Sequence, residues 1–443
     1  MRILFVCADL VWPPTAGGRI RTLSQLRALA SLDDVERITL FSLSEEAMPA
    51  STRDDAAREL PSVVLLDPVF HPVHLWRHLR HVPHVAWLRI TRGVPYLAAK
   101  WDSQAVRGAL ERELGARSFD VVWLGSLGLA RYLPLLRDLQ PRARVVLDGH
   151  NVESEIWAQF ASRQKGIWKR IAQAEWRRAR DFEREALRAV DAVAAISQDD
   201  TRAYRELAGI TAQYVPQVVP FTRRSSSRLC ETRLCYVGTL SWRPNVRGLD
   251  WFCREVWPRV RDRLPDATLD IAGSGLPTDG AGAAIAPPAW RVPGVNVLGF
   301  VEDVAPLYER SAAMIAPHLE GTGVRMKLLE AFRHGVPLVT TPAGAAGLPI
   351  DAGREAFVEA DPRAFANAVV AVATDAGQQQ RLRDAGFAFL ERHHGLAAAQ
   401  NALRGLLGLE TQAARSLVPL MDEGPRDGSG RSRRTELAFP RSH

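Results

Sequence analysis

The chain has 443 residues, more than one hydrophobic core usually accommodates, so two domains of about 200 residues each are expected. Its composition is that of an ordinary soluble protein, and no stretch approaches about 18 uninterrupted apolar residues, so we expect no membrane-spanning helix. The formal net charge of +7 comes almost wholly from arginine and favours an anionic partner, such as a nucleotide or a phospholipid. No nucleic-acid-binding motif is present, so DNA and RNA are not expected partners.

The N-terminus and the cysteines indicate a cytoplasmic protein. The sequence MRILFVCADL has one charge before a short apolar run, which fits a first buried strand better than a signal peptide. The four cysteines lack metal-site spacing and are expected to be reduced thiols rather than a disulfide framework.

Short apolar runs alternate with segments of helical length in both halves of the chain. The predicted strands are 2–8, 37–43, 62–67, 121–124, 144–148 and 192–196 in the first half, and 233–238, 268–273, 295–301, 313–316 and 338–341 in the second. This alternation predicts an α/β protein with two mostly parallel sheets, each covered by helices on both faces. Ligands of such sheets bind beyond the carboxyl ends of the strands, so the two domains are expected to face each other across a cleft.

The domain boundary is predicted in a stretch rich in proline, arginine and serine. We expect a first domain over 1–210, an interdomain linker over 211–232 and a second domain over 233–390. A helical segment over 391–410 is expected to pack back on the first domain, and the polar stretch over 411–443 is predicted to be disordered.

Two candidate ligand contacts follow strands of the first half. Gly17 and Gly18 come after the first strand and open a predicted helix over 20–32, where free N–H groups suit a phosphate or a sugar; a purely structural tight turn is the alternative. His150 follows the strand that ends at Asp148 and is placed to touch a ligand, unless the backbone alone satisfies it. Ser197 is expected to cap a helix over 201–207.

The most informative stretch of the second half is 317–348, PHLEGTGVRMKLLEAFRHGVPLVTTPAGAAGL. Gly321 and Gly323 leave a bare backbone at the start of a predicted helix, whose free N–H groups can face an anion. Lys327 and Glu330 are three residues apart, so they share the helical face that Gly323 opens. An ordinary helix that binds nothing is the alternative.

This stretch resembles the donor site of family 4 of the retaining GT-B glycosyltransferases, through Gly323, Lys327, Glu330, Ala331, Gly335 and Pro337. The resemblance implies a GT-B fold of two Rossmann-like domains and a nucleoside diphosphate sugar as co-substrate, without a further cofactor or a metal. It also implies that Lys327 stabilises the diphosphate, that Glu330 binds the ribose, and that His150 lies near the donor sugar. The same resemblance adds donor-binding roles for Gly17, Gly18, Val301, Thr322, Gly323 and Val324.

The sequence departs from the common family pattern at two points. Thr239 stands where an arginine is usual, and Thr322 stands where a glutamate usually contacts the donor sugar. A branch associated with exopolysaccharide synthesis resembles this chain in Trp242-Arg-Pro-Asn245 and in 323–327, so the departures fit a subfamily pattern. Phosphate neutralisation is assigned to Lys327 and an arginine chosen from Arg243, Arg247 and Arg325, with Arg243 ranked first because Pro244 stiffens its loop.

The resulting expectation is a metal-independent glycosyltransferase that acts on a glycolipid or polysaccharide acceptor. No Asp-x-Asp pair stands where a divalent ion would hold the diphosphate, so arginine and lysine must neutralise the leaving group. Two alternatives stay open: a GT-B epimerase acting on a nucleotide sugar, and a non-catalytic GT-B partner in polysaccharide assembly.

Two further segments combine aromatic rings with basic side chains. The stretch 71–84 holds five histidines, for which a metal site is conceivable, although prolines bracket the segment and no carboxylate or cysteine is interleaved. The stretch 76–101 is better read as an interfacial surface that attaches the protein to the inner face of the plasma membrane. The stretch 167–180 repeats this chemistry, and for it a solvated charged helix is the default interpretation, with an interfacial surface as an equal alternative.

Overall fold

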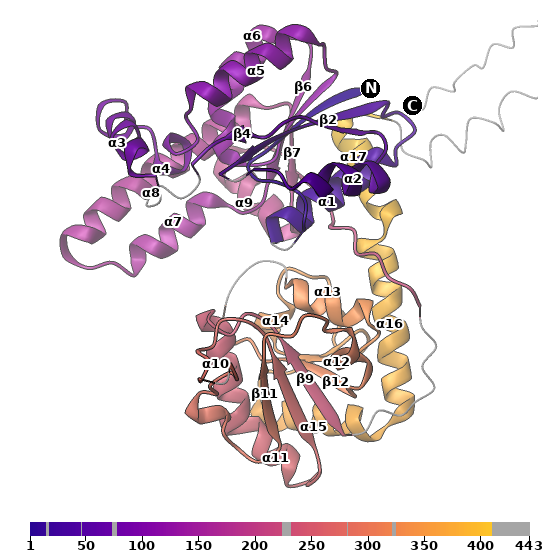
Figure 1. Cartoon of the computed structure of the whole chain (residues 1–443). Coiled ribbons are helices and arrows are strands. Elements are labelled where there is room, and N and C mark those ends of the chain that lie inside the picture. Colours follow the sequence, from indigo (N-terminus) through magenta and orange to yellow (C-terminus); the bar gives the residue numbers. More distant parts are fainter. Residues whose placement is uncertain are drawn as a thin grey trace, which may run out of the picture.

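Two parallel β-sheets, one in each half of the chain, form the framework of the computed structural model (Figure 1). The structure describes residues 1–14, 17–45, 47–72, 78–223, 232–280, 282–320 and 325–409. The first sheet has the order β3-β2-β1-β5-β6-β7-β8, with β4 paired to β2. Its strands are β1 Arg2–Cys7, β2 Arg37–Ser44, β3 Val63–Leu65, β4 Val69–Phe70, β5 Val121–Leu124, β6 Arg144–Gly149, β7 Ala192–Ala195 and β8 Gln213–Tyr214.

The second sheet has the order β11-β10-β9-β12-β13-β14, again with every described pair parallel. Its strands are β9 Arg233–Val237, β10 Thr268–Ala272, β11 Val295–Gly299, β12 Ala313–Ala316, β13 Leu338–Thr340 and β14 Phe357–Val358. The predicted α/β class with two parallel sheets is therefore confirmed.

Helices cover both sheets. Those that follow strands of the first sheet are α1 Gly17–Ala30, α2 Ala50–Glu59, η1 Leu79–His81, α3 Val82–Thr91, α4 Tyr96–Ala99, α5 Gln104–Ala116, η2 Leu127–Tyr132, α6 Leu133–Leu139, α7 Glu153–Ser162, α8 Gly166–Ala189 and α9 Gln198–Ala208. Those of the second half are α10 Arg243–Trp251, the π-helical turn η3 Phe252–Val256, α11 Trp257–Arg261, η4 Pro288–Trp290, α12 Ala305–Glu309, α13 Met326–Arg333, α14 Pro342–Ala345, α15 Pro362–Thr374, α16 Ala376–His394 and α17 Leu396–Leu407.

The central strands are apolar on both faces because both faces are covered. In β1, Ile3 and Phe5 belong to one buried cluster, whereas Leu4 and Val6 belong to the cluster on the opposite face of the sheet. Successive side chains of a strand point to opposite faces, so a continuous apolar run fills two cores at once. The apolar runs that predicted these strands reflect this double burial.

Helix α17 belongs to the core of the first domain although it ends the described chain. Ala399, Leu403 and Leu406 are buried among side chains of α1 and of the first sheet. Arg404 adds an ion pair with Asp34, at 2.9 Å. Helix α16 runs from the second domain up to the first, and α17 continues there (Figure 1).

The interdomain connection predicted over 211–232 contains more structure than its composition indicates. It includes β8, which pairs with β7, and the buried side chains of Val215 and Val219. Its residues 224–231, like the predicted tail from 410 onward, lie outside the described residues. Within the described ranges, no helix combines the length and the apolar composition needed to cross a bilayer.

We predict that Leu403→Ala lowers the free energy of unfolding of the first domain by about 2–5 kcal/mol, because it leaves a cavity in a fully packed core. Leu396→Ala on the same helix is the matched control, since Leu396 is 42% exposed and its truncation should change the free energy by less than about 0.5 kcal/mol. Urea denaturation of both variants checks this prediction, and equal effects would contradict the packing of α17 described above.

Candidate functional site

The carboxyl edge of the second sheet is shaped by two turns that pack on each other. Gly273 follows β10 with a φ of +155°, and a Cβ there would lie 1.7 Å from the carbonyl oxygen of Gly238, which follows β9. Only glycine therefore allows the two backbones to approach this closely. The approach brings the β9–α10 turn over the same edge of the sheet from which α13 starts.

Four polar side chains meet beside these turns and form what we call the Lys327 cluster: Tyr236, Asn245, His318 and Lys327. The Lys327 ammonium donates hydrogen bonds to the Tyr236 hydroxyl (2.8 Å) and to Asn245 Oδ1 (2.9 Å). It also lies over the Tyr236 ring, 4.6 Å from its centroid. His318 Nε2 lies 3.0 Å from Asn245 Oδ1, and Asn245 Nδ2 donates to the carbonyl of Thr239 (2.8 Å).

The cluster is cationic and, among the described residues, contains no carboxylate. Burial, followed by the nearby charge of Arg325, lowers the pKa of Lys327 to about 7. Burial, followed by the charges of Lys327 and Arg325, lowers the pKa of His318 to about 3, so this imidazole is neutral. An anion bound beside Lys327 would favour the protonated ammonium and would offset the free-energy cost of burying that charge.

Arg325 is the second cation of this region. Its side chain is 8% exposed, its guanidinium lies over the Trp242 ring at 5.5 Å, and its Nε is buried without a hydrogen-bond partner. Burial lowers its pKa from the ordinary value. A buried N–H without an acceptor is costly, so Arg325 has a donor available for an incoming oxygen.

The two other arginines considered from the sequence lie differently. Arg243, which the sequence ranked first, is exposed at the first position of α10. Arg247 pairs with Glu320 at 2.8 Å, and both side chains are about half exposed. Arg325 is thus the arginine whose charge the structure couples to Lys327. The sequence missed Tyr236, Asn245 and His318; His318 follows a strand end, the same signal that identified His150.

Helix α13 starts later than the sequence predicts. It begins at Met326, with Arg325 still extended, so the prediction of a helix opening at Gly323 is wrong in its boundary. An extended residue before the helix allows Arg325 to turn toward Trp242. The proposed donor contacts Thr322, Gly323 and Val324, with Gly321, lie outside the described residues.

Glu330 faces the end of α13 rather than Lys327. Its Oε1 accepts from Arg333 Nη1 (3.1 Å) and lies 3.2 Å from His334 Nε2. Burial alone would raise the pKa of Glu330, but the hydrogen bond with His334 and the charge of Arg333 lower it below the ordinary value. Glu330 is therefore an ionised carboxylate already held by two partners.

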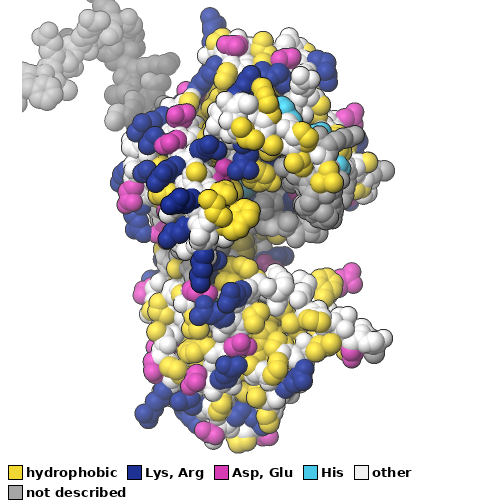
Figure 2. Space-filling model, turned by 90° about the vertical axis from the view of Figure 1, so that its left-hand side faces the viewer, with side chains coloured by type: hydrophobic (Ala, Val, Ile, Leu, Met, Phe, Trp, Pro, Cys, Tyr) yellow, Lys and Arg dark blue, Asp and Glu magenta, His cyan; other side chains and the backbone are white. Residues whose placement is uncertain are grey.

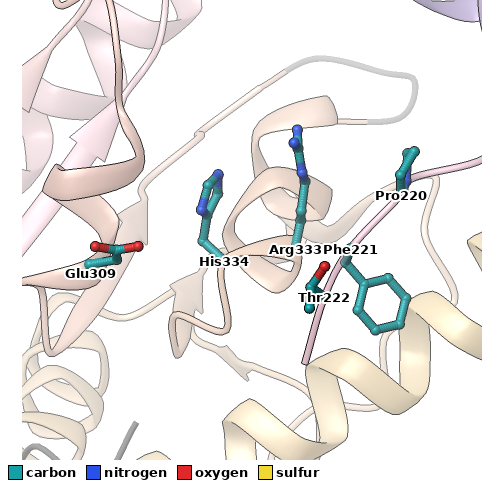
Figure 3. A pocket seen from close by; sticks show the side chains of 6 residues that line it. All are labelled: Pro220, Phe221, Thr222, Glu309, Arg333 and His334. Atoms are coloured by element: carbon teal, nitrogen blue, oxygen red, sulfur yellow. The ribbon is translucent and has the colours of Figure 1, made fainter. Parts of the chain in front are cut away.

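Those two partners line a hollow at the interdomain connection. It has a volume of about 260 Å³ and is lined by Pro220, Phe221, Thr222, Glu309, Arg333 and His334 (Figure 3). Glu330 is therefore linked through its neighbours to the segment that joins the domains. Val301, another proposed donor contact, follows β11 and packs half-buried against the core of the second domain.

In the first domain, the structure brings His150 to the start of α1. Gly17 and Gly18 open this helix, and a Cβ on Gly18 would lie 4.0 Å from His150 Nδ1. His150 follows β6, and its Nε2 lies 2.7 Å from Asp148 Oδ2. The contact with Asp148 favours a proton on Nε2, which leaves Nδ1 facing the glycine turn.

Asp148 is held in turn by Arg21 from α1. The two side chains are 0% and 2% exposed, and Arg21 Nη2 donates to Asp148 Oδ1 at 2.7 Å. Burial alone would raise the pKa of Asp148, but Arg21 and then His150 lower it well below its ordinary value. Arg21 also donates to the carbonyl of Val215 (3.2 Å), so one guanidinium joins α1, β6 and the start of the interdomain connection.

Within the described part of the chain, no group of three or more histidine, cysteine, aspartate or glutamate side chains is arranged to hold a metal ion. His74, one of the five histidines noted in the sequence, lies outside the described residues.

The chain is similar to known glycosyl transferases in sequence and in structure. Residues 231–375 match the family model of the group 1 glycosyl transferases. An uncharacterised 44.6 kDa protein in the cps region of Klebsiella pneumoniae is 23% identical over 400 residues, which cover 89% of this chain and 96% of that protein.

Solved structures of other proteins resemble most of the chain, and two of them illustrate this similarity. Anabaena HepE in complex with UDP-glucose has a TM-score of 0.57 at 15% identity, and the similarity covers 92% of this chain and 100% of that one. Sucrose-phosphate synthase from Thermosynechococcus elongatus has a TM-score of 0.59 at 15% identity, covering 95% and 100%. The chain has the GT-B fold, and its matched segment includes the whole Lys327 cluster.

We predict that Asp148→Asn lowers the free energy of unfolding by about 3–5 kcal/mol, because it leaves the buried Arg21 charge without its partner. Asp67→Asn is the control, because Asp67 is paired with Arg53 but its side chain is 92% exposed. This change should lower the free energy of unfolding by less than about 1 kcal/mol. The contribution of Asp148 should be complete above pH 3.8, its unfolded value, and should be lost progressively below it. Urea titrations between pH 3 and pH 7 test both statements, and a pH-independent difference between wild type and variant in this range would contradict the second.

Proposed function

We propose that this protein is a retaining glycosyltransferase that moves a sugar from a nucleoside diphosphate sugar to an acceptor alcohol on a glycolipid or a growing polysaccharide. The observation that carries the proposal is the pair of buried cations, Lys327 and Arg325, at the carboxyl edge of the second sheet without a carboxylate partner among the described residues. The matched family over 231–375 and the UDP-glucose complex of the similar HepE support a nucleotide sugar as donor. The relative in a cps region supports an acceptor in polysaccharide synthesis.

In the proposed reaction, the bond between the sugar C1 and the diphosphate oxygen breaks while a bond to the acceptor oxygen forms on the same face. The acceptor hydroxyl proton passes to the leaving phosphate oxygen, so the protein supplies no nucleophile. Lys327 and Arg325 neutralise the charge that develops on the diphosphate, the role that a divalent ion has in other transferases. Arg243, exposed at the start of α10, is available to the outer phosphate oxygens.

The two domains have different roles in this scheme. Glu330 accepts hydrogen bonds from the ribose hydroxyls, and its ion pairs keep it ionised for that purpose. His150 presents Nδ1 to the donor sugar from the first domain, beside the N–H groups of Gly17 and Gly18. Domain closure brings these groups to one substrate, so catalysis is mainly electrostatic and positional.

Lys327→Ala should weaken binding of the preferred nucleoside diphosphate by about 10- to 100-fold, because it removes a charge-assisted contact. Above pH 7 the wild-type lysine must take up a proton to bind the anion, so wild-type affinity should fall as the pH rises from 7 to 8.5. The variant has no such group and should lose this pH dependence. Calorimetry in buffers of different ionisation enthalpy measures both the affinity and the proton uptake.

Arg247→Ala is the matched control, since it removes an exposed cation close to the cluster and should change the affinity less than about threefold. An equal loss in both variants would show a diffuse charge effect and would refute the assignment to Lys327. A panel of nucleotide sugars completes the test: transfer supports the proposal, epimerisation identifies an epimerase, and binding without turnover identifies a non-catalytic partner.

We further propose that the enzyme works at an anionic membrane surface. Helices α3, α7 and α8 lie on one side of the first domain, where hydrophobic and basic side chains are exposed together (Figure 2). Ile167 and Trp168 on α8 are 63% and 66% exposed, and Lys165, Lys169 and Arg170 flank them. On α3, Trp87 and Ile90 are 47% and 82% exposed.

Some of the basic and aromatic side chains expected for this surface make contacts inside the protein instead. Arg89 pairs with the buried Glu175 at 2.7 Å, and Trp101 is only 6% exposed. Trp76 and Arg77 lie outside the described residues. The interfacial chemistry is therefore concentrated at the start of α8 and on the outer side of α3.

Wild-type protein should sediment with anionic vesicles at low salt and be released at high salt, because each basic residue near the surface contributes roughly 1 kcal/mol. Ile167→Ala/Trp168→Ala should reduce the bound fraction severalfold, since it removes the apolar contact. Phe300→Ala in the second domain is the control, because Phe300 is 75% exposed but lies away from this surface. Equal binding of all three proteins, or no binding to anionic vesicles at low salt, would favour a soluble acceptor.

A further inference from the structure

A cavity of about 460 Å³ lies in the first domain, between the residues that follow β4, the helix α3 and the segment from α4 to α5. It is lined among others by His71, His81, His84, Val85, Lys100 and Asp102. Its polar groups are thus mainly nitrogen donors.

His71 is the most buried of these groups. Its side chain is 1% exposed and stacks on the Trp101 ring, with centroids 4.9 Å apart and an angle of 17°. Neither ring nitrogen makes a hydrogen bond of normal geometry. Burial lowers the pKa of His71 and the nearby backbone of Lys100 raises it in part, with a net value of about 4, so the ring is neutral and carries one N–H donor. Because the backbone of Lys100 offers this donor only a poorly aligned acceptor, a ligand oxygen in the cavity could accept from it with better geometry.

Lys100 supplies a cation to the same cavity. Its ammonium lies 4.9 Å from the centroid of the Trp101 ring, and no carboxylate of the described residues lies within 4.0 Å of it. Asp102, the carboxylate in the lining, is already engaged: Arg131 Nε donates to its Oδ2 at 2.6 Å, and His84 Nε2 lies 3.9 Å from its Oδ1. The cavity therefore offers one cation and several imidazole nitrogens, and the carboxylate in its described lining is paired with Arg131.

The cavity is linked to the candidate active site through Glu153, the first residue of α7. The charge of Glu153 acts on Lys100, and Lys100 and His150 both act on Glu153. The cavity also lies beneath the proposed membrane-binding surface, because Val85 of α3 lines it while Trp87 and Ile90 of the same helix are exposed. The cavity is therefore coupled electrostatically to His150 through Glu153, and one of its lining helices carries exposed apolar side chains on its outer side.

We propose that this cavity binds the phosphate group of a phosphorylated acceptor, with Lys100 and His71 as its principal contacts. The inference rests on the proposed function and specifies its acceptor as a sugar phosphate or a phosphate-linked amphiphile. The phosphate would anchor the acceptor so that its free hydroxyl reaches the donor sugar beside His150. The volume accommodates a phosphate together with part of a sugar or an alkyl chain.

The test is calorimetric titration of the full chain with inorganic pyrophosphate and with dodecyl phosphate below its critical micelle concentration. Lys100→Gln should weaken binding of the alkyl phosphate about tenfold or more, and His71→Gln severalfold. Arg202→Gln, which removes a 71% exposed charge on α9, and Lys327→Ala, in the nucleotide site, should leave it unchanged. If His71→Gln does not fold, comparing Lys100→Gln with its controls still shows whether the alkyl phosphate binds in this cavity.

Binding of pyrophosphate with the same sensitivity to Lys100→Gln supports a soluble phosphorylated acceptor, and binding of dodecyl phosphate alone supports a lipid-linked one. Binding that is lost in Lys327→Ala but kept in Lys100→Gln would locate the phosphate in the nucleotide site and overturn the inference. So would equal affinity in all variants, or no binding of either probe. Nucleotide binding measured on the same variants keeps the two proposals separate, because Lys100→Gln should retain it and Lys327→Ala should not.

Discussion

The buried pair of Arg21 and Asp148 is the interaction on which the first half of the site depends. Its two charges are almost fully removed from water, which is unfavourable unless each charge finds several good partners. Here the partners come from distant segments: α1 supplies the arginine, β6 the aspartate, and the start of the interdomain connection a carbonyl. The same aspartate contacts His150, so the orientation of the side chain that faces the glycine turn follows from a structural ion pair.

The second half of the site uses the opposite arrangement. Lys327 and Arg325 are buried cations whose described surroundings offer hydroxyl, amide, carbonyl and aromatic groups, but no carboxylate. Burial and the nearby charge of Arg325 explain the lowered pKa of Lys327, and a bound anion would offset both effects. The compensated charges in the first domain fix the orientation of a side chain, whereas the uncompensated cations in the second domain suit an anion.

The central strands could be predicted from the sequence because they are buried on both faces and are therefore continuous apolar runs. The strands 121–124 and 313–316 were predicted with the bounds that the structure gives. The prediction missed β4, β8 and β14, each of two residues, because periodicity cannot be seen over so short a span. It also ranked Arg243 above Arg325, since the packing of Arg325 on Trp242 depends on how far α13 extends, and that boundary is not visible in the local pattern.

The location of α17 has a consequence for the order in which the protein can be made. The last strand of the first sheet ends at Tyr214, but the helix that completes the core of that domain begins at Leu396, about 180 residues later. During synthesis, the apolar surface of the first domain that α17 covers stays exposed until the second domain has also been synthesised. Two covalent segments then cross between the domains side by side, joined by a hydrogen bond from Val219 to His394 (3.0 Å) and by the stacking of Phe221 on Phe387. Two covalent connections at one edge restrict the relative positions of the two domains more than a single linker of the same length would.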